Sequence, residues 1–347
     1  MSPIVLGIAG PVLTDEERTM IRQVDPAGFI LFARNIVDPA QLLALTTDLR
    51  AVTGRADLPV MIDQEGGSVA RLRPPHWPAF PGASRFAAAY RQAPMTAIQA
   101  ARANGEALGH VLAGVGITMN AAPVLDLGHL DTEAGLAART LGADPLSVAA
   151  LGRALVEGMA SAGVVAILKH LPGHGRATVD AHRARPVVTA TADALAIDLA
   201  PFRRVAGQGA PAAMIGHVVY TAWDAGRPAS QSPTVIDRIV RGTMGFDGLL
   251  LSDDLHMDAL TGPIEERAVA AIAAGCDLAL CCHVAPAEAL RIAARLGPMT
   301  TLAEHRLARA VVARSRPGDA GEAIARRDTL LAASNVADRL AMPGGNA

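Results

Sequence analysis

Aromatic side chains are scarce in this sequence of 347 residues, and neither sign of charge is in large excess. Two Trp, two Tyr and six Phe offer few surfaces on which a ligand could stack, so polar groups must provide most of any ligand recognition. The net charge is −2 and no basic run is present, which removes the electrostatic basis for binding nucleic acid. We therefore expect no nucleic acid partner.

Cysteine is also scarce, and its three copies are poorly placed for disulfide bonds. Cys276, Cys281 and Cys282 lie within seven residues in a strand-like run, which favours buried thiols over a redox or metal role. The N-terminus lacks the charged and apolar regions of a signal peptide, and no stretch reaches the roughly 18 uninterrupted apolar residues of a membrane span. These absences predict a soluble, cytoplasmic protein without a membrane partner.

Short apolar runs alternate along the chain with longer amphipathic segments, several of which begin at Asp, Ser or Thr beside a Pro, a helix-start signal. The predicted strands are Ile4–Ala9, Gly28–Phe32, Pro59–Asp63, Ile117–Ala121, Val164–His170, Ala212–His217, Leu249–Asp253 and Asp277–Cys281. The predicted helices are Asp15–Val24, Pro39–Val52, Pro94–Val115, Pro145–Ala162, Thr191–Ala206, Pro233–Met244 and Pro263–Ala274. A helical tail is predicted over residues 286–342, followed by a flexible P-G-G-N-A end.

Eight strands that alternate with helices predict an α/β fold with a parallel sheet, and eight is the number that closes a (β/α)8 barrel of the TIM type. An open, doubly wound sheet is the alternative, but G-I-A-G-P follows the first strand in place of its G-x-G-x-x-G phosphate turn. No repeat or linker divides the chain. We expect one barrel domain over residues 1–347.

Polar residues stand at the ends of five predicted strands, where the active site of such a barrel lies. They are Asp63, Asn120, Lys169, His170, His217, Asp253 and Asp254. Because neighbouring strand residues point to opposite faces, only one of Asp253 and Asp254 is expected to face the barrel centre, and the other to cap a helix or orient a neighbour. At another strand end, Asp63 can accept hydrogen bonds from vicinal hydroxyls while the Arg71 fork donates to the same ligand.

The segment after the fifth strand is rich in titratable groups and begins with a Pro172-Gly173 break. Asp180 stands two residues before His182, and a carboxylate that is hydrogen-bonded to an imidazole fixes its tautomer and makes it a better base. Gly173 and Gly175 suggest that this loop can move over the site.

A zinc site is the competing interpretation of the same segment. His170, His174, His182 and Asp180 could ligate the metal, but the first strand ends in Ala9-Gly10-Pro11 and not in the His-x-His pair that barrel metallohydrolases often carry. We expect neither a metal nor another cofactor.

Five motifs, in this order and spacing, resemble glycoside hydrolase family 3, and within it the branch of single-domain bacterial β-N-acetylglucosaminidases. The motifs are D-Q-E-G-G at 63–67 with Arg71 downstream, A-P-V-L-D-L at 122–127, K-H-L-P-G-H-G at 169–175, D-A-H at 180–182 and G-F-D-G-L-L-L-S-D-D-L at 245–255. The resemblance runs from about residue 28 to residue 260, and the His/Asp loop is specific to this branch. Leu171 stands where Phe is usual, Leu141 where an aromatic is usual, and His256 where Ser is common.

The resemblance implies a retaining exo-β-N-acetylglucosaminidase that removes GlcNAc from GlcNAc-anhydro-N-acetylmuramyl fragments, with or without peptide, in cell-wall recycling. In that scheme Asp253 is the nucleophile, and His182, paired with Asp180, is the general acid/base. The remaining matches would hold the sugar's hydroxyls and acetamido group or line the subsite floor: Asp63, Arg71, Arg139, Lys169, His170 and His217.

Two alternatives stay open. A phosphorylase on the same scaffold is one, because a His acid/base does not repel incoming phosphate as a carboxylate would. A non-catalytic sugar-binding barrel is the other, although it would need neither Asp253 nor the Asp180–His182 pair.

Overall fold

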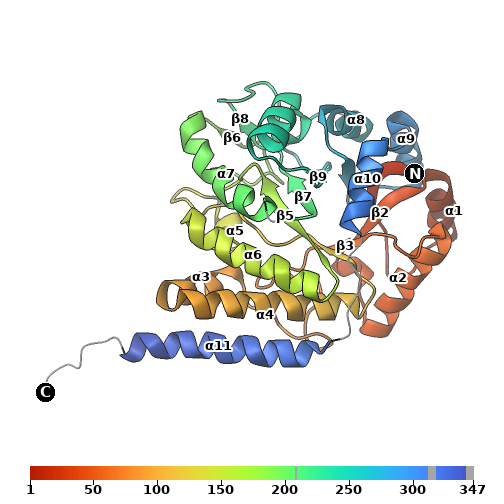
Figure 1. Ribbon diagram of the computed structural model, residues 1–347. Coiled ribbons are helices and arrows are strands. Elements are labelled where there is room, and N and C mark those ends of the chain that lie inside the picture. The colour runs from red at the N-terminus through yellow and green to blue at the C-terminus, as the bar shows by residue number, and fades with distance from the viewer. Residues whose placement is uncertain (208, 312–317, 341–347) are drawn as a thin grey trace, which may run out of the picture.

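Eight parallel strands close a barrel in a computed structural model that describes residues 1–207, 209–311 and 318–340, the last six of these by backbone only (Figure 1). Around the barrel the order is β1, β10, β9, β7, β5, β4, β3, β2. The strands are β1 (Ser2–Gly7), β2 (Pro26–Leu31), β3 (Val60–Ile62), β4 (Met119–Asn120), β5 (Val165–Leu171), β7 (Ala212–Ile215), β9 (Leu249–Asp254) and β10 (Leu278–Cys281). The predicted (β/α)8 barrel is confirmed, and each of the eight predicted strands corresponds to one of these.

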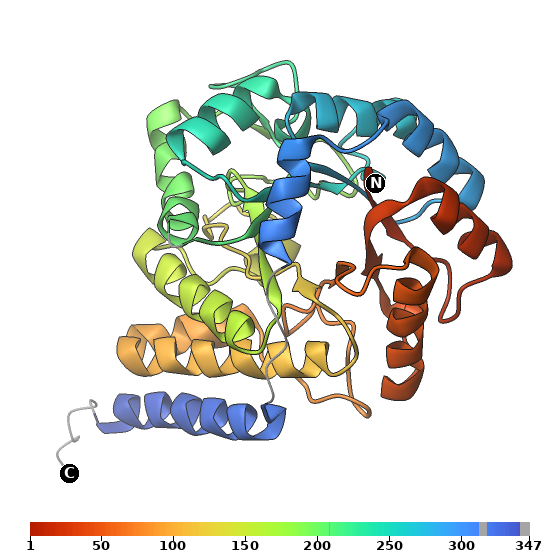
Figure 2. The same ribbon diagram turned by 45° about the vertical axis from the view of Figure 1, so that its right-hand side comes forward.

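Helices surround the barrel, as Figures 1 and 2 both show. The predicted ones are present as α1 (Asp15–Val24), α2 (Pro39–Thr53), α4 (Pro94–Ala113), α6 (Pro145–Ser161), α7 (Ala192–Ala206), the π-helical η3 (Thr234–Thr243) and α8 (Ile264–Ala274). The sequence did not predict α3 (Ala83–Gln92), α5 (Ala134–Ala137), the short turns η1 (Ala33–Asn35) and η2 (Ala229–Gln231), or the separate parallel pair β6 (Val187–Val188) and β8 (Val219–Tyr220).

Helix starts follow the capping signals that the sequence contains. The side chains of Asp38, Asp144 and Thr191 accept hydrogen bonds from backbone amides in the first turns of α2, α6 and α7. These bonds satisfy amides that have no partner within the helix, which fixes where each helix begins.

The described parts of the C-terminal segment contain the predicted helices. They are α9 (Pro286–Leu296), α10 (Thr301–Ala310) and α11 (Ala320–Leu340), while residues 312–317 and 341–347 lie outside the described part. Helix α11 runs beside α4 and also packs on α3 (Figures 1 and 2). Among the described residues, no helix has both the length and the apolar character to cross a bilayer.

Strand residues alternate between the barrel interior and the layer under the helices. Val165, Ile167, Leu249 and Leu251 belong to an inner cluster, which Met299 and Leu307 join from the α10 region at the N-terminal end of the barrel. Their strand neighbours Ala166, Leu168 and Leu250 pack outward against the helices. Lys169 follows Ile167 by two residues on β5, and Asp253 follows Leu251 by two residues on β9. Because side chains alternate along a strand, Lys169 and Asp253 also point to the barrel interior, at the carboxyl ends of the strands.

Candidate active site

A pocket of about 520 Å³ lies at the carboxyl ends of the strands. Residues predicted for the site that line it are Asp63, Arg71, Arg139, Lys169, His170, Asp180, His182 and Asp253. Further lining residues include Phe32, Arg34, Glu65, His174, Asp254 and His283. Eight of the nine predicted site residues therefore meet in one cavity, although they come from segments up to 190 residues apart (Asp63 to Asp253).

Lys169 is the centre of a charged cage on one side of the pocket. Its ammonium lies 3.0 Å from Asp63 Oδ1 and 2.7 Å from Glu65 Oε1. Arg139 donates from Nε and Nη2 to the two oxygens of Glu65, at 3.0 and 2.8 Å, and Arg71 Nη2 lies 3.4 Å from Asp63 Oδ2. Lys169 is buried, and it is the only lysine among the 31 basic residues of the chain. A compact ammonium fits between two carboxylates where a planar guanidinium would not.

The cage keeps its charges at all physiological pH values. Burial would raise the pKa of Asp63, but the cations of Lys169 and Arg71 outweigh burial and lower that pKa to about 2. Burial would lower the pKa of Lys169, yet Glu65 and Asp63 raise it. Arg71 Nε is buried without a hydrogen-bond partner among the described residues, and an unpaired buried donor in a pocket wall is available to a ligand.

A second group, around Asp126, fixes the residues that follow Lys169. His170 Nδ1 lies 2.7 Å from Asp126 Oδ2, and the backbone amide of His174 donates to Asp126 Oδ1 at 2.6 Å. Burial, with His170 beside it, lowers the pKa of His174 to about 4, so this ring is neutral at physiological pH. Asp126 is the single charged residue in the buried A-P-V-L-D-L motif, which was the sequence signal for it.

The Asp180–His182 pair lies on the loop between β5 and β6. His182 Nδ1 is 2.8 Å from Asp180 Oδ1, and the carboxylate also accepts the backbone amide of His182 at 2.9 Å. Because a carboxylate only accepts, Nδ1 carries a proton and Nε2 is the atom free to exchange one with a ligand. The His182 side chain is 69% exposed, so solvent and substrate can both reach it.

Two glycines in this loop have packing roles that account for their presence. A Cβ at Gly175 would lie 1.9 Å from the Leu127 carbonyl oxygen, so a larger residue does not fit there. The carbonyl of Gly173 accepts a hydrogen bond from the Tyr220 hydroxyl at 2.8 Å, and that of Gly175 accepts one from Thr132 at 2.5 Å. The start of the loop is therefore held by hydrogen bonds to Tyr220 and Thr132, and its movement over the site stays a prediction.

The same loop is also fixed to the segment that follows β9. The amide of Ala259 donates to the Ala181 carbonyl at 3.1 Å, and Arg185 Nε donates to the Ala259 carbonyl at 2.8 Å. These bonds hold the residue next to His182 against the chain that continues from Asp253. The acid/base candidate and the carboxylate candidate are thus placed in the wall of one pocket.

Asp253 and Asp254 both line the pocket, although only one of them was expected to face the barrel centre. Asp254 is the last residue of β9, and the pairing with β10 is irregular there, so strict alternation does not hold. Asp253 Oδ1 accepts the amide of Asp254 at 2.8 Å. Asp254 orients its neighbours, as expected for one of the two carboxylates, since its Oδ1 accepts the amides of His256 and Cys282 at 3.2 and 3.1 Å.

His217 also differs from its expected place on the pocket floor. It is fully buried behind the lining residues, with Nδ1 2.7 Å from the Ser230 hydroxyl and Nε2 3.0 Å from the Asp254 carbonyl. Burial lowers the pKa of this ring, so it is neutral and donates from Nε2 to the carbonyl while Ser230 donates to Nδ1. His217 positions the end of β9 from behind and does not line the cavity.

Asn120 has a similar supporting role. It is fully buried, accepts the Gln64 amide at 2.9 Å and donates to the Gln64 carbonyl at 2.9 Å. It therefore shapes the turn between Asp63 and Glu65.

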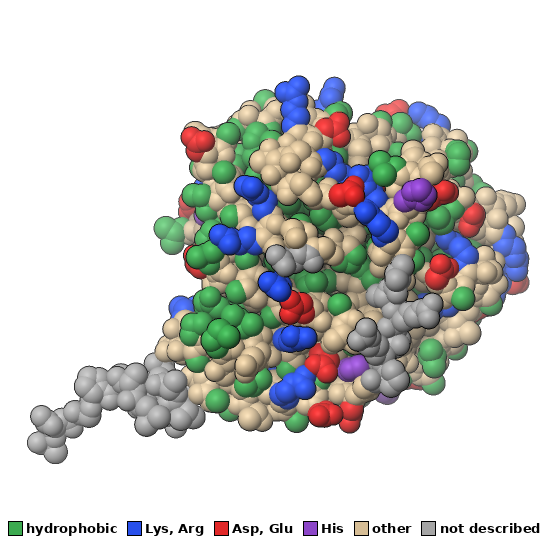
Figure 3. Space-filling model, in the orientation of Figure 1, with side chains coloured by type: hydrophobic (Ala, Val, Ile, Leu, Met, Phe, Trp, Pro, Cys, Tyr) green, Lys and Arg blue, Asp and Glu red, His purple; other side chains and the backbone are tan. Residues whose placement is uncertain are grey.

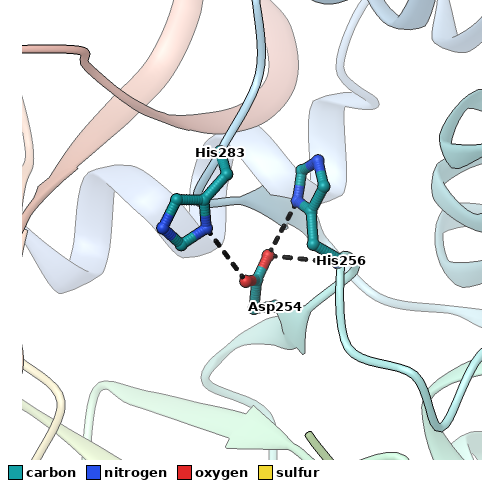
Figure 4. A group of neighbouring side chains, drawn as sticks. All are labelled: Asp254, His256 and His283. Atoms are coloured by element: carbon teal, nitrogen blue, oxygen red, sulfur yellow. Dashed lines mark hydrogen bonds and ion pairs between the residues drawn. The ribbon is translucent and has the colours of Figure 1, made fainter.

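The four residues proposed for zinc do not converge on one point within the described ranges. His170 pairs with Asp126, whereas His182 pairs with Asp180 on the exposed loop. In residues 1–207, 209–311 and 318–340, the donor atoms of Asp254, His256 and His283 do converge, as Figure 4 shows. In the sequence, His256 stands out only as a departure from the family pattern.

Some pocket residues were missed from the sequence altogether. Arg34 and Phe32 follow β2 directly, and the guanidinium of Arg34 lies 4.7 Å above the Phe32 ring. His283 follows Cys282 at the end of β10, with its ring 5.6 Å from that of Phe32. The sequence could have indicated these residues only by their position, since each stands just past the carboxyl end of a barrel strand.

Known proteins that are similar to this chain in sequence and in fold are carbohydrate-active enzymes. The "Glycosyl hydrolase family 3 N terminal domain" matches residues 6–312. A β-hexosaminidase of Bordetella avium is 40% identical over 284 residues, 81% of this chain and 80% of the relative, and one of Aromatoleum aromaticum is 38% identical over 322 residues, 91% and 88%. The crystal structure of NagZ from Neisseria gonorrhoeae in complex with N-trifluoroacetyl-D-glucosamine aligns with a TM-score of 0.84 at 32% identity, covering 99% of this chain and 98% of that chain.

Proposed function

The chain belongs to glycosyl hydrolase family 3 and is an enzyme of the β-hexosaminidase type, and on this premise we propose that it is a retaining exo-β-N-acetylglucosaminidase. The observation that carries the proposal is the presence, in one pocket, of a carboxylate at a strand end, an Asp–His pair on a docked loop and a charged cage. These are the three parts that glycosyl transfer to and from the protein requires: nucleophile, acid/base and sugar-binding groups.

In the proposed first step Asp253 attacks the anomeric carbon of a terminal GlcNAc while His182 Nε2–H protonates the leaving oxygen. Asp180 holds Nδ1–H and stabilises the imidazolium from which that proton comes. In the second step the neutral imidazole takes a proton from water, which attacks the glycosyl–Asp253 ester and releases GlcNAc with its β configuration retained. A histidine replaces the second carboxylate that most glycosidases use.

The cage is proposed to bind the non-reacting side of the sugar. Asp63 is ionised and has acceptor capacity beyond its bonds to Lys169 and Arg71, so it can accept hydrogen bonds from two vicinal hydroxyls. Arg71 and Lys169 can donate to the same hydroxyls, and His170 and Arg139 flank them. The N-acylated glucosamine in the NagZ relative supports GlcNAc as the sugar.

We infer further that the substrates are GlcNAc-anhydro-N-acetylmuramyl fragments, with or without peptide, in cytoplasmic cell-wall recycling. The cavity of about 520 Å³ has room for more than one sugar. Three cysteines are buried as free thiols, which suits a reducing compartment. On the face drawn in Figure 3 acidic and basic side chains are interspersed, which suits a small substrate better than a nucleic acid. One catalytic domain over the whole chain is part of the proposal, since α11 packs on α3 and α4 of the barrel wall.

The test compares release of nitrophenol from p-nitrophenyl β-N-acetylglucosaminide and from the β-glucoside. We expect the wild type to cleave only the first substrate, and Asp253→Ala to lose that activity. Asp258→Ala, an exposed carboxylate five residues away, is the matched control and should retain it. Failure of well-folded wild type to cleave either substrate would contradict the proposal and favour a sugar-binding protein.

Phosphorolysis is the second candidate, because the acid/base is an imidazole and Arg34 and Arg71 add positive charge to the pocket wall. The discriminating experiment measures rate and product with and without phosphate. Free GlcNAc at a phosphate-independent rate supports hydrolysis, and GlcNAc 1-phosphate would show phosphorolysis.

A further inference from the structure

We propose that Asp254, His256 and His283 form a zinc-binding site at the edge of the pocket, and that zinc bound there inhibits the enzyme. The three side chains come from the end of β9, the turn after it and the residue that follows Cys282. Figure 4 shows both imidazole rings turned with Nδ1 toward the Asp254 carboxylate. One ligand atom from each residue lies within 4.8 Å of the others.

The separations suit a tetrahedral ion. With zinc–ligand bonds of about 2.1 Å, neighbouring ligand atoms of a tetrahedral site are about 3.4 Å apart. Asp254 Oδ1 is 3.1 Å from His256 Nδ1, and Oδ2 is 3.7 Å from His283 Nδ1. One nitrogen from each imidazole and one oxygen of the carboxylate lie within 4.8 Å of one another, so small rotations of the side chains would bring these three atoms onto one ion. Two imidazoles and one carboxylate favour Zn²⁺ over Mg²⁺ or Ca²⁺, which prefer all-oxygen sites.

The site would leave one coordination position open, because it has three protein ligands. Asp254 and His283 line the pocket, so the ion can be reached from it. The backbone fixes Asp254, whose Oδ1 accepts the amides of His256 and Cys282. A carboxylate held in this way loses little conformational freedom when it binds a metal.

Arg34 opposes the ion and sets an upper limit to its affinity. Its Nη1 lies 3.0 Å from His283 Nε2, and since a guanidinium only donates, His283 carries its proton on Nδ1. Zinc must displace this proton, and Arg34 must leave Nε2. We therefore expect weaker and more pH-dependent binding than at a structural zinc site.

Inhibition is expected because the metal ligand Asp254 directly follows Asp253 in the chain. This argument depends on the role proposed for Asp253. The Asp254 amide donates to Asp253 Oδ1 at 2.8 Å, so an ion on Asp254 lies next to the nucleophile. A nearby positive charge stabilises the ionised carboxylate and lowers its nucleophilicity. The ion would also occupy the pocket edge.

The experiment measures Zn²⁺ binding to the metal-free full-length protein by isothermal titration calorimetry, independently of activity. His256→Ser should bind at least about tenfold more weakly, because even loss of a group that only supports a ligand costs 10–100-fold. His305→Ser, an exposed histidine on α10, is the matched control and should bind like the wild type. His182→Ala should also bind like the wild type, which separates this site from the Asp180–His182 pair. If His256→Ser does not fold, His283→Asn replaces it.

Equal affinity in wild type and His256→Ser, loss in His182→Ala alone, or no binding by the wild type would overturn the site. The second arm measures hydrolysis of the nitrophenyl substrate with increasing Zn²⁺. We expect inhibition of the wild type that EDTA reverses, and resistance of His256→Ser to the same zinc concentrations. Zinc binding without inhibition would overturn the inhibitory role and leave the site, and cleavage in metal-free buffer tests the proposed function separately.

Discussion

His174 should make the folded protein less stable as the pH falls from 6.5 toward 4, and His174→Asn should remove that contribution. The ring is buried beside His170, at 5.4 Å between ring centroids, and its Nδ1 has no hydrogen-bond partner among the described residues. Burial, together with the neighbouring His170, lowers its pKa from 6.5 to about 4. Asn stays neutral throughout this range and keeps the backbone amide that donates to Asp126.

The magnitude follows from the difference between the two pKa values. At 1.36 kcal/mol for each pH unit, the difference between 6.5 and about 4 corresponds to about 3 kcal/mol. Above pH 6.5 the ring is neutral in both states and contributes nothing to the pH dependence. Between the two values the unfolded chain binds the proton and the folded protein does not, so stability falls as the pH falls. About 2 kcal/mol should be lost between pH 7 and pH 5.

Urea unfolding of wild type and His174→Asn at several pH values between about 7 and 5 measures this contribution directly. The difference in unfolding free energy between the two proteins should change by about 2 kcal/mol over that range, in favour of the variant at low pH. His305→Asn, which replaces an exposed histidine, should run parallel to the wild type. Parallel curves for wild type and His174→Asn would refute the argument that the ring is buried uncharged.

Three further outcomes follow from the same contacts. Lys169→Met should destabilise the protein by about 3–5 kcal/mol in urea unfolding, because it leaves Asp63 and Glu65 without their shared cation. Lys169→Arg should not restore sugar hydrolysis, since the larger guanidinium does not fit between the two carboxylates. A wild-type kcat/KM in Lys169→Arg would contradict this. His182→Ala should lose far more activity on natural disaccharides than on substrates with activated leaving groups, because only the former need a proton on the leaving oxygen; equal losses would exclude it as the acid. Excess EDTA should leave turnover of the purified enzyme undiminished, and a loss that zinc restores would show that catalysis needs a metal.

The barrel could be predicted from the sequence because strand and helix periods are both strong in it. Each buried strand is a short apolar run, and several helices start at a recognisable cap such as Asp38 or Asp144. The predicted strand 117–121 shows the limit, since only Met119–Asn120 pair as β4. Apolar character reports burial, whereas pairing depends on neighbouring strands that the sequence does not specify.

The site could be predicted as a set of residues but not as a set of contacts. Lys169 and Asp253 continue the inner alternation of their strands, so their direction is encoded locally. His217 continues the outer alternation of Ala213 and Ile215, so the strand period itself places it behind the wall, where Ser230 holds it. The position of Asp254, in contrast, depends on an irregular pairing between two strands. That outcome is tertiary, and the segment of Asp254 contains no signal for it.

The charges of the cage limit which groups can make activity depend on pH. The pKa of Asp63 is lowered to about 2 and that of Glu65 is also lowered, in both cases because Lys169 and an arginine outweigh burial, and the pKa of Lys169 is raised. None of the three changes charge between about pH 5 and pH 8, so sugar binding by the cage should be constant over that range. A pH-dependent kcat/KM must then arise outside the cage. His182 is the group in the pocket that has to exchange a proton in both proposed steps, and for that reason the pH profile of His182→Ala on an activated substrate should be flatter than that of the wild type.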